Sequence, residues 1–256
     1  MKLPIIFMLC VILNSDGFTQ TSVLESSDKK LKILMVLSNA GYYGNSSIMT
    51  ANHFGETVVP YDIFVSAGYV VDFVSPKGGR VPIGYINTSD DIMAQYIHDH
   101  DFMDKLNGTK TPTEIYAGDY IAIFYSGGGS AMFGVPDDSQ IQKIAMAIYE
   151  KNKGVISSIC HGTAGLVNLK TSDGAYLVKN KKVSGFPDYF ENMDAEYYKQ
   201  FPFSIQKAIK DKQGNFVYTE ERGANYFVVD GRLVTGQDPS SARSLSLKII
   251  EILGTL

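Results

Sequence analysis

Four continuous apolar runs are the feature that most constrains the fold of this chain. They cover residues 31–37, 70–74, 120–125 and 155–159. Apolar runs without alternation are typical of strands that are buried on both faces, and such strands occur in parallel sheets covered by helices. The runs therefore predict the inner strands of one parallel sheet.

Helix-like stretches separate these runs. Residues 56–67, 91–106 and 139–153 carry apolar side chains at three- and four-residue spacing, which predicts amphipathic helices. Strands that alternate with helices in this way indicate an α/β fold with a doubly wound, mostly parallel sheet flanked by helices, as in flavodoxin-like proteins. We find no internal repeat or linker and expect a single domain over residues 31–256.

The C-terminal part predicts two more strands and a last helix. Residues 225–229 and 232–235 flank a turn at Asp230. Asp238 then suits the N-cap of the last helix and Pro239 its first position. One apolar stripe of this helix is expected to face the core, and it consists of Ala242, Leu245, Ile249 and Ile252.

The first 30 residues differ in character from the rest. Lys2 precedes an apolar run over residues 3–13, and a polar, Ser/Thr-rich stretch follows it up to Lys30. This pattern predicts a signal peptide, assigned to residues 1–22, and a secreted or periplasmic protein. The alternative is a buried N-terminal helix or strand. The run is too short to span a bilayer, so no membrane attachment is expected after removal of the leader.

Composition and histidine placement exclude several classes of function. The chain of 256 residues has a net charge of -4 and a pI near 5.6, and it lacks the basic stripe of a nucleic-acid-binding protein. His98 and His100 stand two residues apart on a predicted helix, a spacing that does not converge on a metal ion. We therefore expect no nucleic acid, no metal and no cofactor.

Cys160 is the strongest candidate for a reactive group. The segment Ser158-Ile159-Cys160-His161-Gly162 directly follows an apolar strand and leads into a helix-like stretch. Small residues two positions on either side of a nucleophile are typical of a strained turn in which strand and helix pack closely. Amide groups at the start of the helix are expected to lower the pKa of the thiol. The alternative is an inert, buried cysteine, and His161 is either a base or an exposed capping residue.

A glycine-rich loop follows the strand that ends at Tyr125. Gly127, Gly128 and Gly129 would offer backbone N–H donors to an oxyanion. Gly162, next to the predicted nucleophile, is expected to bind the substrate as well. No Gly-Lys-Ser/Thr follows, so the loop is not a nucleotide-binding P-loop. A plain turn between strand and helix is the alternative.

Four separated motifs together resemble the ThiJ/PfpI superfamily, and in particular its heat-shock-chaperone and glyoxalase III branch, of class I glutamine-amidotransferase-like fold. The likeness covers nearly all of the chain after the leader. The motifs are residues 159–164, Met132 with residues 136–138, residues 183–187, and residues 230–239.

The resemblance implies a role for four side chains. Cys160 matches the nucleophile and His161 its neighbouring histidine, while Glu56 matches a glutamate that reaches the thiol and Glu191 an acid that orients the histidine. Two departures stand against a simple transfer, because Gly129 and Val59 replace histidines that many members of the branch carry.

The activity implied by the resemblance is that of glyoxalase III, which converts methylglyoxal and water to lactate without glutathione, as a D-lactate dehydratase does. Two alternatives stay open: a cysteine hydrolase, amidase or peptidase, and a chaperone or thiol oxidation sensor without catalysis. The expected partner is a small carbonyl or amide substrate. Dimers are common among the resembling proteins, which leaves a homodimer open.

Overall fold

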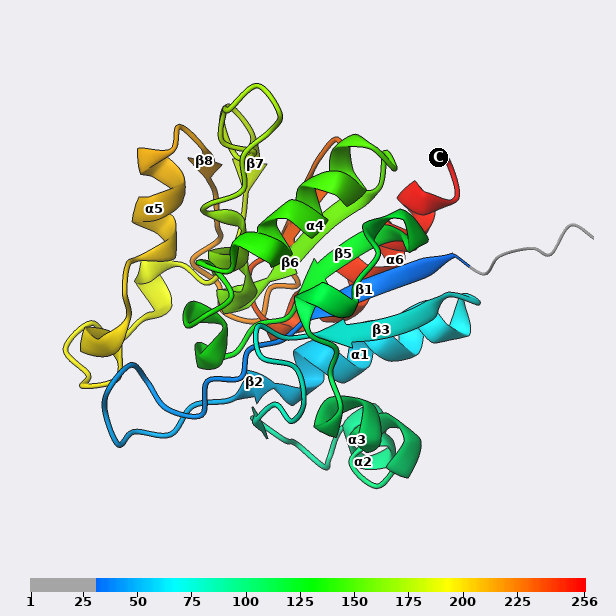
Figure 1. Ribbon diagram of the computed structural model, residues 1–256. Coiled ribbons are helices and arrows are strands. Elements are labelled where there is room, and N and C mark those ends of the chain that lie inside the picture. The colour runs from blue at the N-terminus through cyan, green and yellow to red at the C-terminus, as the bar shows by residue number, and fades with distance from the viewer. Residues whose placement is uncertain (1–30) are drawn as a thin grey trace, which may run out of the picture.

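The computed structural model describes residues 31–256, and the signal peptide predicted for residues 1–22 lies outside them. The described chain is built around a six-stranded sheet (Figure 1). Its strand order is β3 (Val70–Val74), β1 (Lys32–Val36), β5 (Tyr120–Tyr125), β6 (Val155–Ile159), β10 (Leu233–Gly236) and β9 (Phe227–Asp230). The first five strands are parallel and β9 is antiparallel to β10. The predicted doubly wound fold is confirmed.

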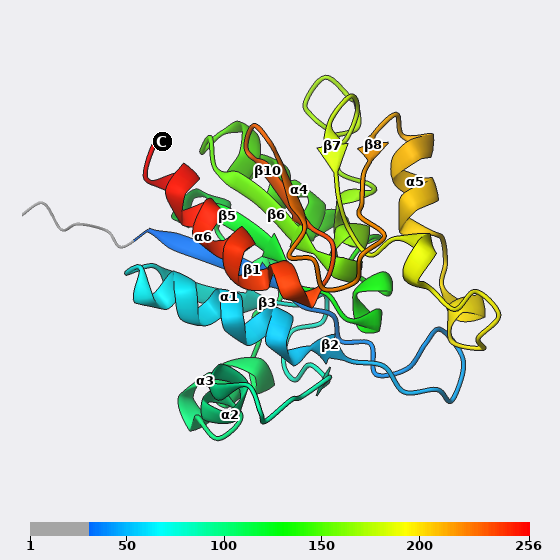
Figure 2. The ribbon, with the colours of Figure 1, turned by 180° about the vertical axis from the view of Figure 1, so that it is seen from behind.

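Helices cover both faces of this sheet (Figures 1 and 2). Helices α1 (Phe54–Ser66) and α6 (Ala242–Leu253) pack on one face, and α4 (Ser139–Glu150) packs on the other. Successive side chains of β1 point to opposite faces of the sheet. Ile33 packs on the side of α1 and Leu34 on the side of α4. Both faces of β1 are therefore buried from Ile33 to Val36, which explains why these four residues are all apolar.

The predicted helix over residues 91–106 is wrong, because the segment forms two helices. These are α2 (Asp91–Tyr96) and α3 (His100–Asn107). The Asp99 carboxylate accepts a hydrogen bond of 2.9 Å from the backbone N–H of Phe102, so it caps the N-terminus of α3 and starts a new helix. His98 consequently lies in the link and His100 begins α3.

The last helix begins later than predicted. Asp238 caps a 3-10 turn over Pro239–Ser241, and α6 starts at Ala242. Within the predicted stripe, Ala242, Leu245 and Ile249 are buried, whereas Ile252 is partly exposed.

Segments that follow the carboxyl ends of the strands gather on one side of the sheet (Figure 1). They include the short parallel pair of β2 (Asn52–His53) with β4 (Ile83–Gly84). A second short pair, β7 (Lys182–Val183) with β8 (Asn215–Phe216), lies beside α5 (Ile205–Asp211). This is the side on which open α/β sheets hold their ligands.

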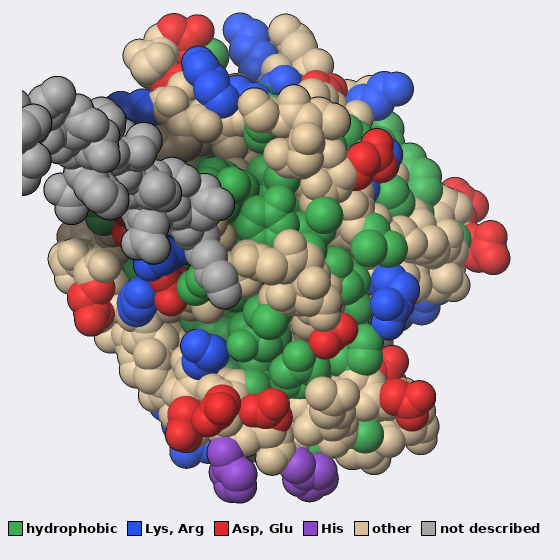
Figure 3. All heavy atoms as spheres, turned by 90° about the vertical axis from the view of Figure 1, so that its right-hand side faces the viewer, with side chains coloured by type: hydrophobic (Ala, Val, Ile, Leu, Met, Phe, Trp, Pro, Cys, Tyr) green, Lys and Arg blue, Asp and Glu red, His purple; other side chains and the backbone are tan. Residues whose placement is uncertain are grey.

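The opposite side of the sheet, at the amino ends of the strands, has a different surface. Figure 3 shows apolar side chains in the middle of that face and histidine side chains only at its lower edge. Four exposed apolar residues lie just before β1, in α1, in α6 and at the C-terminus, and they are Leu31, Val65, Leu247 and Leu256. None of the helices formed by residues 31–256 combines the length and apolar character needed to cross a membrane.

Candidate active site

Cys160 stands on a strained turn directly after β6. Its φ is 56°, a left-handed conformation that non-glycine residues rarely adopt. The hydroxyls of Ser158 and Thr163, on either side of the turn, are hydrogen-bonded at 2.8 Å. A Cβ on Gly162 would lie 2.3 Å from the carbonyl oxygen of Tyr125, so this position requires glycine. The predicted strained turn is present, but it opens a 3-10 helix, Cys160–Leu166, in place of an α-helix.

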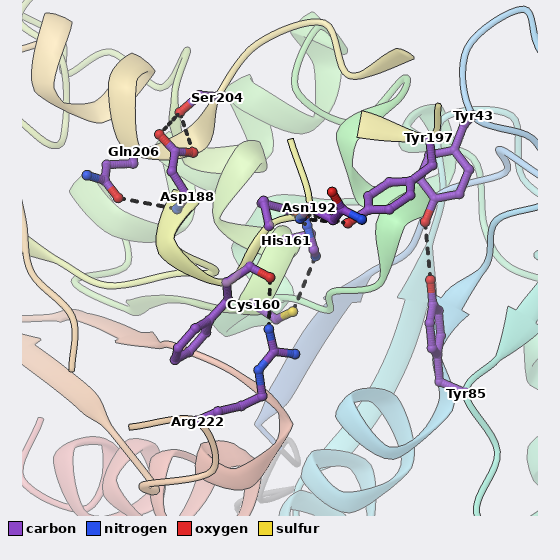
Figure 4. A network of polar contacts seen from close by, with 12 residues as sticks. Tyr43, Tyr85, Cys160, His161, Asp188, Asn192, Tyr197, Ser204, Gln206 and Arg222 are labelled. Carbon is purple, nitrogen blue, oxygen red and sulfur yellow. Dashed lines mark hydrogen bonds and ion pairs between the residues drawn. The ribbon is translucent and has the colours of Figure 1, made fainter. Parts of the chain in front are cut away.

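His161 connects the thiol to Glu191, and Figure 4 shows its contact with Cys160. The Nδ1 atom lies 3.4 Å from Cys160 Sγ, and Nε2 lies 2.7 Å from Glu191 Oε1. The hydroxyl of Tyr197 donates to the other oxygen of Glu191 at 3.0 Å. With Nε2–H donating to Glu191, the lone pair of Nδ1 faces the thiol. The geometry thus brings together three predicted site residues: Cys160, the base His161 and Glu191, which orients the base.

Packing holds the His161 ring in this orientation. The ring stacks on Phe186, with centroids 4.6 Å apart and an interplanar angle of 25°, and it also contacts Phe201. The side chain is 12% exposed and that of Glu191 only 6%. The pair is therefore largely shielded from water, which strengthens its hydrogen bond.

Glu56 is a second acidic neighbour of the thiol. It is the third residue of α1, it is fully buried, and its Oε2 atom lies 2.3 Å from where a Cβ on Gly127 would be. Among residues 31–256, neither carboxyl oxygen has a hydrogen-bond partner of ordinary geometry. Burial raises the pKa of Glu56 to about 8, although the neighbouring Cys160 thiol and the Gly127 N–H offset part of the rise. Glu56 is thus a neutral carboxylic acid at pH 7.

The expected low pKa of Cys160 is wrong. Burial of the thiol and the negative charge that Glu56 carries when ionised both raise the pKa of Cys160, and the N–H groups of His161 and Gly128 offset only part of this. Cys160 is 4% exposed, so the cost of desolvating a thiolate outweighs the backbone dipoles. The resting group is a thiol, and a base is needed to remove its proton.

The glycine loop lies against Cys160, since a Cβ on Gly127 would lie 2.8 Å from the Cβ of Cys160. The carbonyl of Gly127 accepts a 2.9 Å hydrogen bond from the N–H of His53. Gly128 has a φ of 95°, and a Cβ there would lie 2.4 Å from the carbonyl oxygen of Ala51, so no other residue fits. The Gly128 N–H is near enough to the sulfur to lower the pKa of Cys160 in part.

Three residues of the site were missed by the sequence reasoning: His53, Tyr43 and Tyr85. His53 Nδ1 accepts a hydrogen bond from the N–H of Glu56 at 3.3 Å and thereby caps α1. Burial, helped by the charge of His161, lowers the pKa of His53 to about 4. Its ring stacks on Tyr85 at 5.0 Å, and the hydroxyls of Tyr85 and Tyr43 are 3.4 Å apart. No local pattern marks these residues, because histidine is not among the usual N-cap types.

The two departures from the resembling branch have structural counterparts. A Cβ on Gly129 would lie 2.4 Å from the Tyr43 hydroxyl and 2.7 Å from Thr50 Oγ1. The space beside Gly129 is therefore filled by Tyr43, and a histidine would displace it. Val59 packs at the edge of the core shared by α1 and α6.

A groove of about 450 Å³ opens next to these residues. Its walls include Thr50, Ile83 and Tyr85. Within the part of the chain that the structure describes, no three His, Cys, Asp or Glu side chains are placed to hold a metal ion.

The fold and this site define a class of α/β proteins, those with a reactive cysteine on the tight turn after a central parallel strand. The model of the DJ-1/PfpI family matches residues 48–252, which include Cys160, His161, Glu56 and Glu191. The chain belongs to the DJ-1/PfpI family.

Similar proteins of known name agree with this membership. The chain is 30% identical over 236 residues to the glutathione-independent glyoxalase hsp3102 of Schizosaccharomyces pombe, covering 88% of this chain and 98% of that protein. The crystal structure of glyoxalase III from Candida albicans has a TM-score of 0.77 and 27% identity over 87% of this chain and 97% of that one. The Francisella tularensis Rapid Encystment Protein has a TM-score of 0.81 at 27% identity, over 87% of this chain and 99% of that one.

Proposed function

We propose that this protein is a glutathione-independent glyoxalase that converts methylglyoxal and water to lactate. The observation that carries the proposal is the placement of Cys160 between His161, whose Nδ1 faces the sulfur at 3.4 Å, and the buried acid Glu56. Similarity over 98% of the length of a glutathione-independent glyoxalase supports the same reaction.

In the first step, His161 Nδ1 takes the thiol proton while Cys160 Sγ bonds to the aldehyde carbon. The aldehyde oxygen becomes an oxyanion, and the backbone N–H groups of Gly128 and His161 stabilise it. The imidazolium then returns its proton to this oxygen. The product is a hemithioacetal on Cys160. Neutral Glu56 places no charge beside the sulfur during this step.

In the second step, His161 removes the hydrogen on the carbon that is bonded to sulfur. An enediol forms across the two carbons of the substrate, and the proton is delivered to the former ketone carbon. The sulfur is then part of a thioester of lactate. Water attacks the thioester, the C–S bond breaks, lactate leaves and the thiol recovers its proton, so one methylglyoxal and one water yield one lactate.

The test is incubation of residues 31–256 with methylglyoxal in the absence of glutathione, with lactate measured enzymatically. We expect lactate to form with wild type and to disappear in Cys160→Ala. Lactate no higher with wild type than with Cys160→Ala would refute the proposal. An amide substrate that traps an acyl group on Cys160, with no turnover of aldehydes, would instead favour the hydrolase alternative.

Export is a separate proposal, supported by Lys2 and the apolar run that follows it. Secretion of the full chain by cells, with loss of about 20 N-terminal residues in the mass spectrum, is the expected result. A full-length protein retained inside the cells would contradict it.

A further inference from the structure

Two tyrosine hydroxyls meet beside the glycine loop, at a place that the reaction described above does not use. Tyr43 and Tyr85 bring their oxygens to 3.4 Å from one another (Figure 4). The two residues come from separate segments, one before β2 and one directly after β4. Their meeting point is close to Gly129, because a Cβ on that residue would lie 2.4 Å from the Tyr43 oxygen.

The Tyr85 side chain is fixed in direction by three contacts. Its ring lies flat on His53, with an interplanar angle of 4°, and its oxygen is reached by the N–H of Gly129 and the hydroxyl of Tyr43. Although half of the residue surface is exposed, the hydroxyl end is turned inward. The backbone of Tyr85 has a φ of 57°, a strained conformation of the kind that gathers at functional sites.

The Tyr85 oxygen accepts from the N–H of Gly129, and either hydroxyl can be the donor in its contact with Tyr43. When Tyr43 donates to Tyr85, the Tyr85 proton is free for a ligand. Burial is the main cause that raises the pKa of Tyr85, and the nearby Tyr43 and the charge of a Cys160 thiolate raise it further. Tyr85 therefore stays protonated at any pH at which the enzyme would work. It acts as a hydrogen-bond donor and not as a base.

A second observation indicates that an oxygen-bearing ligand belongs here. Thr50 Oγ1 is buried and has no hydrogen-bond partner among residues 31–256, and it lies 2.7 Å from the same Cβ position on Gly129. Buried hydroxyls nearly always have a partner. The groove lined by Thr50 and Tyr85 gives access to this position from solvent.

We propose that the Tyr85 hydroxyl, held by Tyr43 and Gly129, donates a hydrogen bond to the ketone oxygen of the 2-oxoaldehyde substrate. This proposal rests on the proposed glyoxalase function. When His161 removes the hydrogen from the sulfur-bearing carbon, negative charge develops on that ketone oxygen. A donor aimed at developing charge stabilises the transition state more than the ground state.

The test is Tyr85→Phe, which keeps the ring on His53 and removes only the hydroxyl. We expect kcat for methylglyoxal to fall about 100-fold with little change in KM, as for the loss of one oxyanion donor. Deuterium on the aldehyde carbon should slow the variant more than wild type, because proton removal becomes more rate-limiting. Tyr116→Phe is the matched control, since Tyr116 is 74% exposed at the opposite end of β5, and it should match wild type.

Alkylation of Cys160 by iodoacetamide distinguishes a lost donor from a disturbed site. We expect equal alkylation rates in wild type and Tyr85→Phe. A kcat within twofold of wild type in Tyr85→Phe, with Cys160→Ala inactive, would overturn the proposal, and so would a loss of activity that is matched by a changed alkylation rate. If wild type itself makes no lactate, the proposed function fails. The Tyr85 assignment is then tested by whether methylglyoxal protects Cys160 from iodoacetamide, and equal protection in wild type and Tyr85→Phe would overturn it as well.

Discussion

Two buried glutamates belong to the surroundings of Cys160, one next to the thiol and one behind His161, and their hydrogen bonding differs. Glu191 comes from a loop, accepts hydrogen bonds on both oxygens, and touches His161 at 2.7 Å. Glu56 comes from the first turn of α1, is fully buried, and has no hydrogen-bond partner of ordinary geometry in the described chain. The same side chain therefore serves two purposes here, set by environment alone.

The difference explains how a thiol with a raised pKa is able to react. On one side, Glu191 orients His161 so that a base faces the sulfur. On the other, Glu56 stays neutral and spares the nascent thiolate a neighbouring negative charge. Environments that push like groups toward different roles are a recurring device for acid–base chemistry near pH 7.

The largest effect should come from removing the base on the Glu191 side. In His161→Asn we expect kcat for methylglyoxal to fall about 1,000-fold, since general acid–base catalysis contributes this much. Steady-state lactate formation measures it. A loss of less than tenfold would assign the proton transfer to Glu56 and reverse the comparison.

Glu191→Gln should have the next largest effect. The amide preserves shape but weakens the hydrogen bond that orients His161, and we expect kcat to fall about 30-fold. Glu196→Gln is the matched control, because Glu196 forms an exposed ion pair with Lys199. Equal activities of the two variants would remove Glu191 from the account.

Glu56→Gln should cost less activity at pH 7, within about tenfold, because glutamine is neutral like the protonated acid. Wild type should lose activity as the pH rises through about 8, because ionised Glu56 repels the thiolate. The variant should lack this loss. Identical alkaline limbs in the two rate profiles would contradict the role given to Glu56.

The free energy of unfolding should also depend on the protonation of Glu56. The pKa of Glu56 is higher in the folded protein, at about 8, than its ordinary value of 4.5. Between these values the folded state binds more protons than the unfolded state, so the free energy of unfolding falls as pH rises, by a few kcal/mol in total. Urea melts from pH 5 to pH 8 should show this decline in wild type and a flatter profile in Glu56→Gln, whereas Glu191→Gln should decline like wild type.

The smallest effect should come from Tyr197→Phe. This change removes one hydrogen bond to Glu191 and leaves the contact with His161, so we expect kcat to fall about threefold. A fall as large as that of Glu191→Gln would show that Tyr197, and not the glutamate alone, fixes the histidine.

The sheet and the strained turn could be predicted from the sequence because both are local patterns. Apolar runs marked the inner strands, and Ser158 with Gly162 marked the turn around Cys160. The break before α3 was missed because the apolar spacing continues across Asp99, whose capping carboxylate outweighs that spacing.

The other members of the site could not be predicted from local patterns. Glu56 looks like an ordinary charge in the first turn of a helix, and only the fold shows that the glycine loop buries it. Tyr43 and Tyr85 are about 40 residues apart, and their meeting depends on how two loops pack. Glu191 was named only through the family resemblance, since no spacing connects it to His161.

The central claim is that burial keeps Glu56 protonated at neutral pH. Infrared difference spectra of wild type against Glu56→Gln, recorded from pH 5 to pH 10, test it most directly. The account predicts a protonated-carboxyl band in wild type at pH 7 that disappears with a midpoint near pH 8. A carboxylate band at pH 7, with no protonated form above about pH 5, would contradict it.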